Sequence, residues 1–348
     1  RVIFKTLLII KALTIPIFGF TLFIEVKMEE LVKPFDPKVI ENNLREFTEL
    51  LEKETSGGYE VYLLDPNRNK LFNRREILQT PLFQELGRVR EETFRLVGEG
   101  TGRCLDLDPA IDTRFCQIIL WDPKARRIAG GYRAGIGPTM ELADLYNLQV
   151  GFRFSRSFRR YLKRGVEFGR SFVTTEYQTK TGFNSLGQGI HRFIKYLQTT
   201  DFPEIRYLFG GISISSQIPY TFSDRIIFLF QKSFPGKRFR FRSPIIAGGE
   251  NVYSFQSPEE DLESYFRLEG EKDARRAYVK RSLRLMKDMK REGYKFPVLF
   301  ASYADLCGED GSLFSVAVQN KHREGALEVA FINDLYYLNP AQDKIFTD

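Results

Sequence analysis

The chain has 348 residues, of which 43% are hydrophobic and 28% charged, a composition typical of a globular protein with one large core or two smaller ones. Its three cysteines form no CxxC pair and it has only two histidines. These counts argue against a disulfide scaffold or a multi-ligand zinc site and favour a reducing compartment, the cytoplasm. The net charge of +7 suits an anionic membrane surface, an acidic carrier protein or nucleic acid. Because no recognition motif accompanies the charge, we expect no nucleic-acid partner.

The first residues form an unusual apolar segment. Residues 7–26 are mostly apolar, but Lys11 interrupts them, and the longest uncharged stretch, 12–24, has 13 residues. A helix needs about 20 apolar residues to span a bilayer. Three interpretations stay open: a membrane-surface anchor, the end of an upstream region, or translated sequence foreign to the native protein. Met28 is a natural start and favours the last two.

Capping residues and hydrophobic spacing predict alternating helices and strands. A helix over 36–54 begins with Asp36 as N-cap and Pro37 in its first turn. The elements that follow are a strand at 59–64, a helix at 81–97, a hairpin of 115–121 and 128–136, a strand at 166–173, a helix at 184–197, a strand at 207–214 and a helix at 220–234. This order favours an α/β fold with a mixed sheet over a doubly wound parallel one.

The C-terminal part of the chain is set off by a polar, charged stretch at 257–276. After it we predict a basic helix at 276–291, a segment at 297–306, and strands near 313–319 and 327–333. The chain therefore divides into an apolar segment over 1–27, a core over 28–256 and a C-terminal α/β extension over 257–348 that packs on the core.

The strand at 166–173 is the most informative segment. Neighbouring strand residues alternate between faces, so Glu167 and Arg170 would point to opposite sides of a regular strand. A bulge at Gly169 would insert one residue and bring both charges to one face. A carboxylate there suits proton abstraction from an amine, and an exposed backbone N–H suits a thioester oxygen. The alternative is a strand-end salt bridge without a catalytic role.

A glycine-containing helix start follows this strand. Gly187 and Gly189 lie near the beginning of the helix expected at 184–197. Free N–H groups at a helix N-terminus suit a phosphate or a pantetheine arm. A tight packing turn explains the same glycines equally well.

An acidic loop precedes the hairpin and carries Asp106, Asp108 and Asp112. These carboxylates suit an ammonium group or a metal ion, and they also suit solvated turns that they would cap. Arg133, on the second hairpin strand, faces either solvent or this loop.

Several catalytic motifs are absent from the sequence. His191 is not followed by the aspartate of an HxxxxD pattern, and no GxSxG elbow, Walker loop or HExxH motif occurs. His191 is therefore interpreted as a structural residue of its helix.

From about Met28 to its C-terminus, the chain resembles the hemolysin-like, ornithine-lipid and glycine-lipid type N-acyltransferases. These are members of the GNAT superfamily and relatives of the acyl-homoserine-lactone (autoinducer) synthases. The order and spacing of several short stretches support the resemblance: 86–91 with Phe94, 119–123, 130–133, 167–173, 207–210 and 296–299. The resemblance implies a GNAT-like mixed, splayed sheet flanked by helices.

The resemblance also implies roles for individual residues. Glu167 would be the general base with Arg170 as its partner. The expected acceptor and acyl site holds Arg90, Phe94, Asp106, Asp108, Asp112 and Arg133. No bound cofactor or metal is expected. The 4′-phosphopantetheine arm of an acyl carrier protein would bring the acyl group to a site formed by Gly169, Ser171, Phe172, Gly187 and Gly189. The acidic ExDxxD pattern of the autoinducer synthases is only partly matched, which favours a simple amino acid over S-adenosylmethionine as acceptor.

We therefore expect a (3-hydroxy)fatty acyl transfer from acyl carrier protein to glycine or ornithine in aminolipid synthesis, with peripheral contact to the inner face of the cell membrane. Basic residues would dock the carrier, either Arg153, Arg156, Arg159 and Arg160 or the run at 237–242. Two alternatives stay open: a non-catalytic lipid-binding protein of the same fold, and an acyl-homoserine-lactone synthase.

Overall fold

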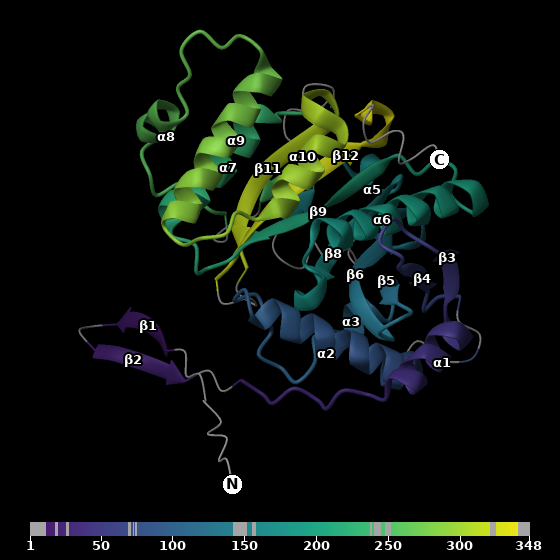
Figure 1. Ribbon diagram of the computed structural model, residues 1–348. Coiled ribbons are helices and arrows are strands. Elements are labelled where there is room, and N and C mark those ends of the chain that lie inside the picture. The colour runs from purple at the N-terminus through teal and green to yellow at the C-terminus, as the bar shows by residue number, and fades with distance from the viewer. Residues whose placement is uncertain are drawn as a thin grey trace.

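A computed structural model describes residues 12–17, 20–25, 28–68, 71, 73, 75–141, 152–154, 158–236, 239, 245–247, 252–320 and 325–339. Its main feature is an eight-stranded sheet in the order β11-β12-β9-β8-β6-β5-β4-β3 (Figure 1). The strands are β3 (Glu49–Glu52), β4 (Glu60–Leu64), β5 (Cys116–Asp122), β6 (Arg127–Ile136), β8 (Gly165–Val173), β9 (Tyr207–Ile214), β11 (Ser312–Gln319) and β12 (Leu327–Asp334). Only β8 and β9 pair in parallel within this sheet, so the predicted mixed α/β sheet is confirmed.

Helices cover both faces of the sheet. They are α1 (Pro37–Phe47), α2 (Pro81–Arg95), α3 (Pro109–Asp112), α5 (Arg159–Leu162), α6 (Lys180–Thr200), α7 (Tyr220–Ser233), α8 (Glu259–Tyr265), α9 (Ala274–Arg291) and α10 (Val298–Gly311). Alternation along β4 shows how the layers form. Val61 and Leu63 pack in the cluster beneath α6, whereas Tyr62 and Leu64 pack in the cluster beneath α1 and α2.

Two further strand pairs lie outside the main sheet. β1 (Ala12–Ile17) pairs with β2 (Phe20–Glu25), and β7 (Phe152–Phe154) pairs with β10 (Ile245–Ala247), both antiparallel. The apolar N-terminal segment thus contains a hairpin. No helix among the residues described has both the length and the apolar character needed to cross a membrane.

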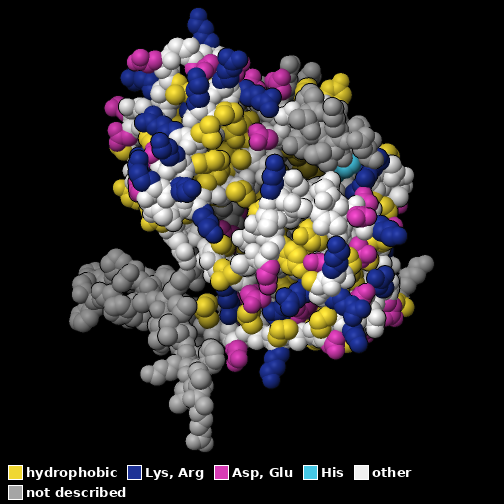
Figure 2. Space-filling view, in the orientation of Figure 1, with side chains coloured by type: hydrophobic (Ala, Val, Ile, Leu, Met, Phe, Trp, Pro, Cys, Tyr) yellow, Lys and Arg dark blue, Asp and Glu magenta, His cyan; other side chains and the backbone are white. Residues whose placement is uncertain are grey.

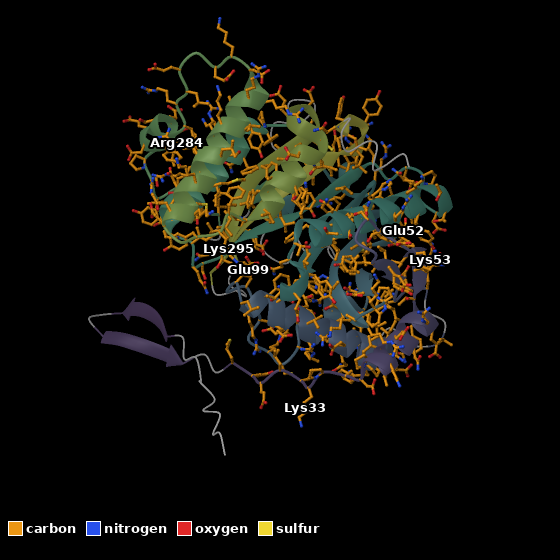
Figure 3. The ribbon with its side chains drawn as sticks, viewed as in Figure 1. Lys33, Glu52, Lys53, Glu99, Arg284 and Lys295 are labelled. Carbon is orange, nitrogen blue, oxygen red and sulfur yellow. The ribbon has the colours of Figure 1, made fainter. Side chains whose placement is uncertain are left out.

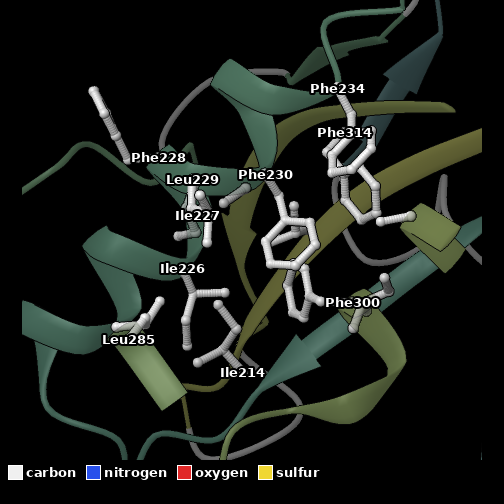
Figure 4. Close-up of a cluster of buried hydrophobic side chains, with 14 of the residues drawn as sticks. Ile214, Ile226, Ile227, Phe228, Leu229, Phe230, Phe234, Leu285, Phe300 and Phe314 are labelled. Atoms are coloured by element: carbon white, nitrogen blue, oxygen red, sulfur yellow. The ribbon is translucent and has the colours of Figure 1, made fainter. Parts of the chain in front are cut away.

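The C-terminal residues continue the central sheet. β12 pairs with β9 over eight residue pairs from Leu327↔Ile214 to Asp334↔Tyr207, and β11 follows at the edge. Phe230, Phe234, Phe300 and Phe314 bring α7, α10 and β11 into one aromatic cluster (Figure 4). The residues of the predicted extension over 257–348 therefore share both the sheet and a hydrophobic core with the preceding residues.

Two predicted helix boundaries were wrong for local reasons. The helix expected over 36–54 ends at Phe47, because Thr48 is extended and Glu49–Glu52 pairs with β4 as the edge strand β3. The helix expected at 184–197 begins at Lys180, where Thr179 caps it by accepting a hydrogen bond from the N–H of Gly182. Gly182 is required there, since a Cβ atom would lie 2.1 Å from the Tyr177 carbonyl oxygen.

Candidate active site

Strand β8 contains a bulge at the point that the sequence predicted. Gly131 of β6 faces Phe172 and Arg133 faces Gly169, so Tyr132 alone lies opposite two residues, Arg170 and Ser171. Arg170 has a φ of 51°, in the left-handed region that a non-glycine residue rarely adopts. The expected bulge near Gly169 is therefore confirmed.

Because of the bulge, side chains after Gly169 face the opposite side of the sheet from the one that regular alternation would give. Val166 and Phe168 pack beneath α6, but Phe172 packs on the opposite face with α2. Glu167, which alternates with its neighbours, therefore lies on the α2 face together with Arg170. Glu167 is buried at 1% exposure. A regular strand would have separated these two side chains.

The bulge coincides with the place where two strands part. β8 and β9 pair only from Gly165↔Tyr207 to Phe168↔Gly210. Beyond this point β8 continues to Val173 beside β6, and β9 continues to Ile214 beside β12. A Cβ atom placed on Gly169 would meet no described atom within 4 Å. The pairing of β8 with β9 therefore ends at Phe168, and the next residue, Gly169, lies beside open space.

Buried ion pairs connect the bulge to α2 and to the acidic loop. Arg170 Nη2 lies 2.9 Å from Asp106 Oδ1, Arg90 Nη2 lies 3.3 Å from Asp112 Oδ2, and Arg133 Nη1 lies 3.6 Å from Asp112 Oδ1. All five side chains are at most 7% exposed. Opposite charges attract each other more strongly in the protein interior than at its surface. Removing one partner leaves an unpaired buried charge.

Aromatic rings form the walls of this network. The Arg170 guanidinium lies 4.9 Å from the centre of the Phe94 ring, and Arg133 lies 5.4 Å from that of Phe115. Phe94 in turn packs edge-on against Phe172, with ring centres 6.4 Å apart. Arg90 and Phe94 are four residues apart on α2, so one helical face supplies both a cation and a ring. The predicted acceptor and acyl residues Arg90, Phe94, Asp106, Asp112 and Arg133 thus gather at the bulge.

Asp108 lies beside this network and acts as the N-cap of α3. Its carboxylate accepts a hydrogen bond from Ala110 N and caps α3, while its own N–H donates to Asp112 Oδ2. The turn-capping interpretation of the acidic loop therefore applies to Asp108. Asp106 and Asp112 face arginines in the interior, and Asp108 caps a turn. Arg133 faces the loop and not solvent.

Gly187 and Gly189 do not lie where the sequence placed them. Because α6 begins at Lys180, both glycines fall beyond its second turn, where backbone N–H groups bond within the helix. A Cβ atom on Gly189 would lie 3.2 Å from Val61, which makes this glycine a close-packing residue. The argument from free N–H groups to a pantetheine site therefore fails for this pair. The helix start is at Thr179–Gly182 instead.

The sequence analysis did not identify three residues near the bulge: Gln117, Tyr132 and Tyr303. Gln117 of β5 bridges the ion network, with Oε1 3.3 Å from Arg90 Nη1 and Nε2 3.1 Å from Asp112 Oδ1. On the α6 face, the hydroxyl groups of Tyr132, Ser171 and Tyr303 lie together. Burial raises the pKa of Tyr132 to about 12, so this hydroxyl stays protonated at neutral pH. Gln117 is weakly indicated in the sequence, because it is a polar residue in an apolar strand. No sequence pattern indicated that Tyr303 lies next to Tyr132.

Within the described part of the chain, no group of three His, Cys, Asp or Glu side chains is arranged to hold a metal ion. In the acidic loop, the carboxylates of Asp106 and Asp112 lie beside guanidinium groups, as described above. The loop is therefore organised around arginine cations.

Comparisons with known proteins agree with this architecture. Residues 89–188 match a family described as an acetyltransferase (GNAT) domain, and this range includes the second half of α2, the acidic loop and the bulge. The chain is 26% identical over 293 residues to a glycine N(alpha)-acyltransferase of Bacteroides thetaiotaomicron, covering 80% of this chain and 78% of that protein. It is 27% identical over 304 residues to a glycine N(alpha)-acyltransferase of Phocaeicola vulgatus, covering 80% and 81%.

A solved structure of BjaI, a CoA-dependent acyl-homoserine lactone synthase, aligns with 45% of this chain and 67% of its own at 14% identity. Its TM-score of 0.29 is too low to bear on the assignment. The matched domain over residues 89–188 is similar to a GNAT acetyltransferase domain, and the splayed mixed sheet and the bulge agree with that similarity. More narrowly, the chain is related to N-acyltransferases, and the resemblance inferred from its sequence is confirmed.

Proposed function

We propose that the protein transfers a (3-hydroxy)fatty acyl group from acyl carrier protein to the amine of glycine or a similarly small amino acid such as ornithine, as a step of aminolipid synthesis. The observation that carries this proposal is the bulge that brings Glu167 and Arg170 to one face where β8 and β9 part. The names of the two relatives support glycine as acceptor.

Glu167 is the general base in this proposal. The acceptor amine is mostly protonated at pH 7 and must lose a proton before it attacks. The Glu167 carboxylate takes that proton directly or through a water molecule. The amine nitrogen then bonds to the thioester carbonyl carbon and loses a second proton, the C–S bond breaks, and the thiolate of the carrier takes up one proton and leaves as a thiol. The acyl group passes directly between substrates without an acyl-enzyme.

The parted strands provide the donor site. Beyond Phe168, β8 no longer pairs with β9, and a backbone N–H group near Gly169 to Phe172 would hold the developing oxyanion of the thioester carbonyl. The pantetheine arm of the carrier would run along Gly169, Ser171 and Phe172. Gly187 and Gly189 are not part of this pantetheine site, because both lie inside α6, where backbone N–H groups bond within the helix.

The arginine network provides the acceptor site. Glycine carries a carboxylate one carbon from its amine, and a guanidinium binds a carboxylate through two parallel hydrogen bonds. Arg170 and Arg133 are the candidates, because Asp106 and Asp112 hold their guanidinium groups beside the bulge. The space at Gly169 suits a small acceptor.

Exposed arginines before β8 are candidates for docking the acidic carrier. Arg159 and Arg160 lie on the exposed side of α5, which leads into β8. The side chain of Arg153, residue Arg156 and all basic residues of the run at 237–242 lie outside the described residues.

The direct test is a reconstituted reaction. Purified full-length protein is incubated with 3-hydroxyacyl carrier protein and glycine, with S-adenosylmethionine replacing glycine in a parallel sample. Mass spectrometry should detect N-acylglycine and no acyl-homoserine lactone. Failure with every amino-acid acceptor, or lactone formation, would overturn the proposal.

A further inference from the structure

Helix α9 carries the entire positive excess of the chain. Its 18 residues, Ala274–Arg291, contain eight Lys and Arg side chains and one acidic residue, Asp288. The whole chain has 52 Lys and Arg against 45 Asp and Glu, so the other residues are balanced at 44 and 44. Helix α9 is therefore a concentrated basic element, while the other residues sum to no net charge.

Much of this charge has no acidic partner. Lys280 pairs with Glu271 and Arg291 pairs with Asp288. Arg276, Lys287 and Lys290 have no carboxylate within 4.0 Å among the described residues, and all three are exposed. Such unneutralised cations leave the α9 surface attractive to an extended anionic partner.

The same helix has an apolar stripe on its outer side. Val279, Leu283 and Met286 follow one another at spacings of four and three residues, so they share one stripe. Leu283 is 61% and Val279 is 44% exposed. Hydrophobic side chains gather over α9 in Figure 2, with Lys and Arg around them. The inner side, with Tyr278, Leu285 and Met289, is already packed on α7.

A cavity lies along another side of α9, where α7 and α8 approach it. Its volume is about 270 Å³, and Phe228 and Phe266 stack within its lining at 6.0 Å between ring centres. Lys232, Arg267 and Arg281 also line it, together with Glu263. Arg281 and Leu283 are roughly 200° apart around the helix axis, so this cavity is separate from the apolar stripe.

We infer that α9 docks the enzyme on the surface of an anionic phospholipid bilayer. Basic side chains along the helix attract the headgroups, and Val279, Leu283 and Met286 insert shallowly between them. The flat spread of charge over a helix about 27 Å long fits an extended lipid surface. This inference goes beyond the proposed function and does not use its chemistry.

Vesicle co-sedimentation of the full-length protein tests the inference. The probes are phosphatidylcholine vesicles with about 30% phosphatidylglycerol and vesicles of phosphatidylcholine alone. The wild-type protein should bind only the anionic vesicles, less tightly as salt rises. The triple variant R276E/K287E/K290E should bind at least about a hundredfold more weakly. Leu283→Ser should bind roughly tenfold more weakly, because it removes an exposed apolar anchor.

The matched control is K33E/K53E/K124E, which changes the net charge equally at exposed positions away from α9. Figure 3 labels two of these residues, Lys33 and Lys53, far from Arg284 of α9. It should bind anionic vesicles like the wild type, within about threefold. Equal loss in both triple variants, no loss in the α9 variant, or no vesicle binding by the wild type would overturn the inference. So would an α9 variant that keeps vesicle binding but has a raised KM for acyl carrier protein, since α9 would then dock the carrier. Vesicle binding by a protein inactive in acyl transfer would overturn the proposed function alone.

Discussion

Arg170 and Asp106 are 64 residues apart in the chain and form a buried ion pair of 2.9 Å between the β8 bulge and the acidic loop. Arg170 adopts a left-handed backbone conformation to make this contact. Its guanidinium also lies over Phe94 of α2. One side chain thus fixes the bulge to the two elements that form the remainder of the candidate site.

The first prediction concerns Asp106. Asp106→Ala leaves the Arg170 and Arg90 cations without this carboxylate, so the free energy of unfolding should fall by about 3–5 kcal/mol. Asp108→Ala in the same loop removes only a helix cap and should cost about 1 kcal/mol. Urea unfolding measures both values. Equal losses would show that the two aspartates have equivalent roles.

The second prediction concerns the space at Gly169. Gly169→Ala should change the free energy of unfolding by less than about 1 kcal/mol, because its Cβ atom meets no described atom within 4 Å. Gly169→Leu extends the side chain further into this space. Acyl transfer should fall in the order Gly, Ala, Leu if substrates occupy this space. Gly210→Ala is the contrast, since its Cβ would lie 2.4 Å from the Phe168 carbonyl oxygen and should destabilise the fold. Full kcat/KM in Gly169→Leu would exclude substrate binding here.

The third prediction distinguishes two glycines of α6. Gly187→Ala should stabilise the protein by up to about 1 kcal/mol, because alanine is the better helix former and the position is open. Its acyl-transfer rate should stay unchanged. Gly182→Ala should destabilise the protein, since its Cβ would overlap the Tyr177 carbonyl. Thermal unfolding and steady-state kinetics measure both effects, and a raised KM for acyl carrier protein in Gly187→Ala would restore the pantetheine role.

The fourth prediction concerns alkaline stability. Burial raises the pKa of Tyr132 to about 12 from an ordinary value of 10.0, so the folded protein holds this proton more tightly than the unfolded chain. Its contribution is fully present below pH 10 and is lost as pH rises toward 12, by about 3 kcal/mol in total. The control is Tyr132→Phe, which lacks the proton. Urea unfolding from pH 9 to 11.5 should show a smaller decline in this variant, and equal declines would contradict the prediction.

Much of this site could be predicted from alternation along one strand. Glu167 and Arg170 could act together only through a bulge, and the bulge is present. The hairpin at 115–121 and 128–136 was also predicted within about a residue of β5 and β6, because its turn residues are local signals.

The features that were missed depend on contacts between distant residues. Tyr303 reaches Tyr132 only because β12 pairs with β9 and brings α10 across the sheet. The start of α6 was missed although Thr179 is a recognisable cap, and Gly182 lies inside the first turn, where glycine weakens a helical pattern. The edge strand β3 was hidden in a helical pattern, because Leu50 and Leu51 fit either spacing.

The central claim is that Glu167 is the general base, and single-turnover acyl transfer by Glu167→Gln tests it most directly. The variant keeps the shape of the side chain but cannot accept the proton. With saturating acyl carrier protein and glycine, its rate should fall by about 10²–10⁴-fold at pH 7. Raising the pH should recover part of the rate by deprotonating the amine in solution. A wild-type rate at pH 7 would contradict the assignment of Glu167 as the base and leave the fold assignment unaffected.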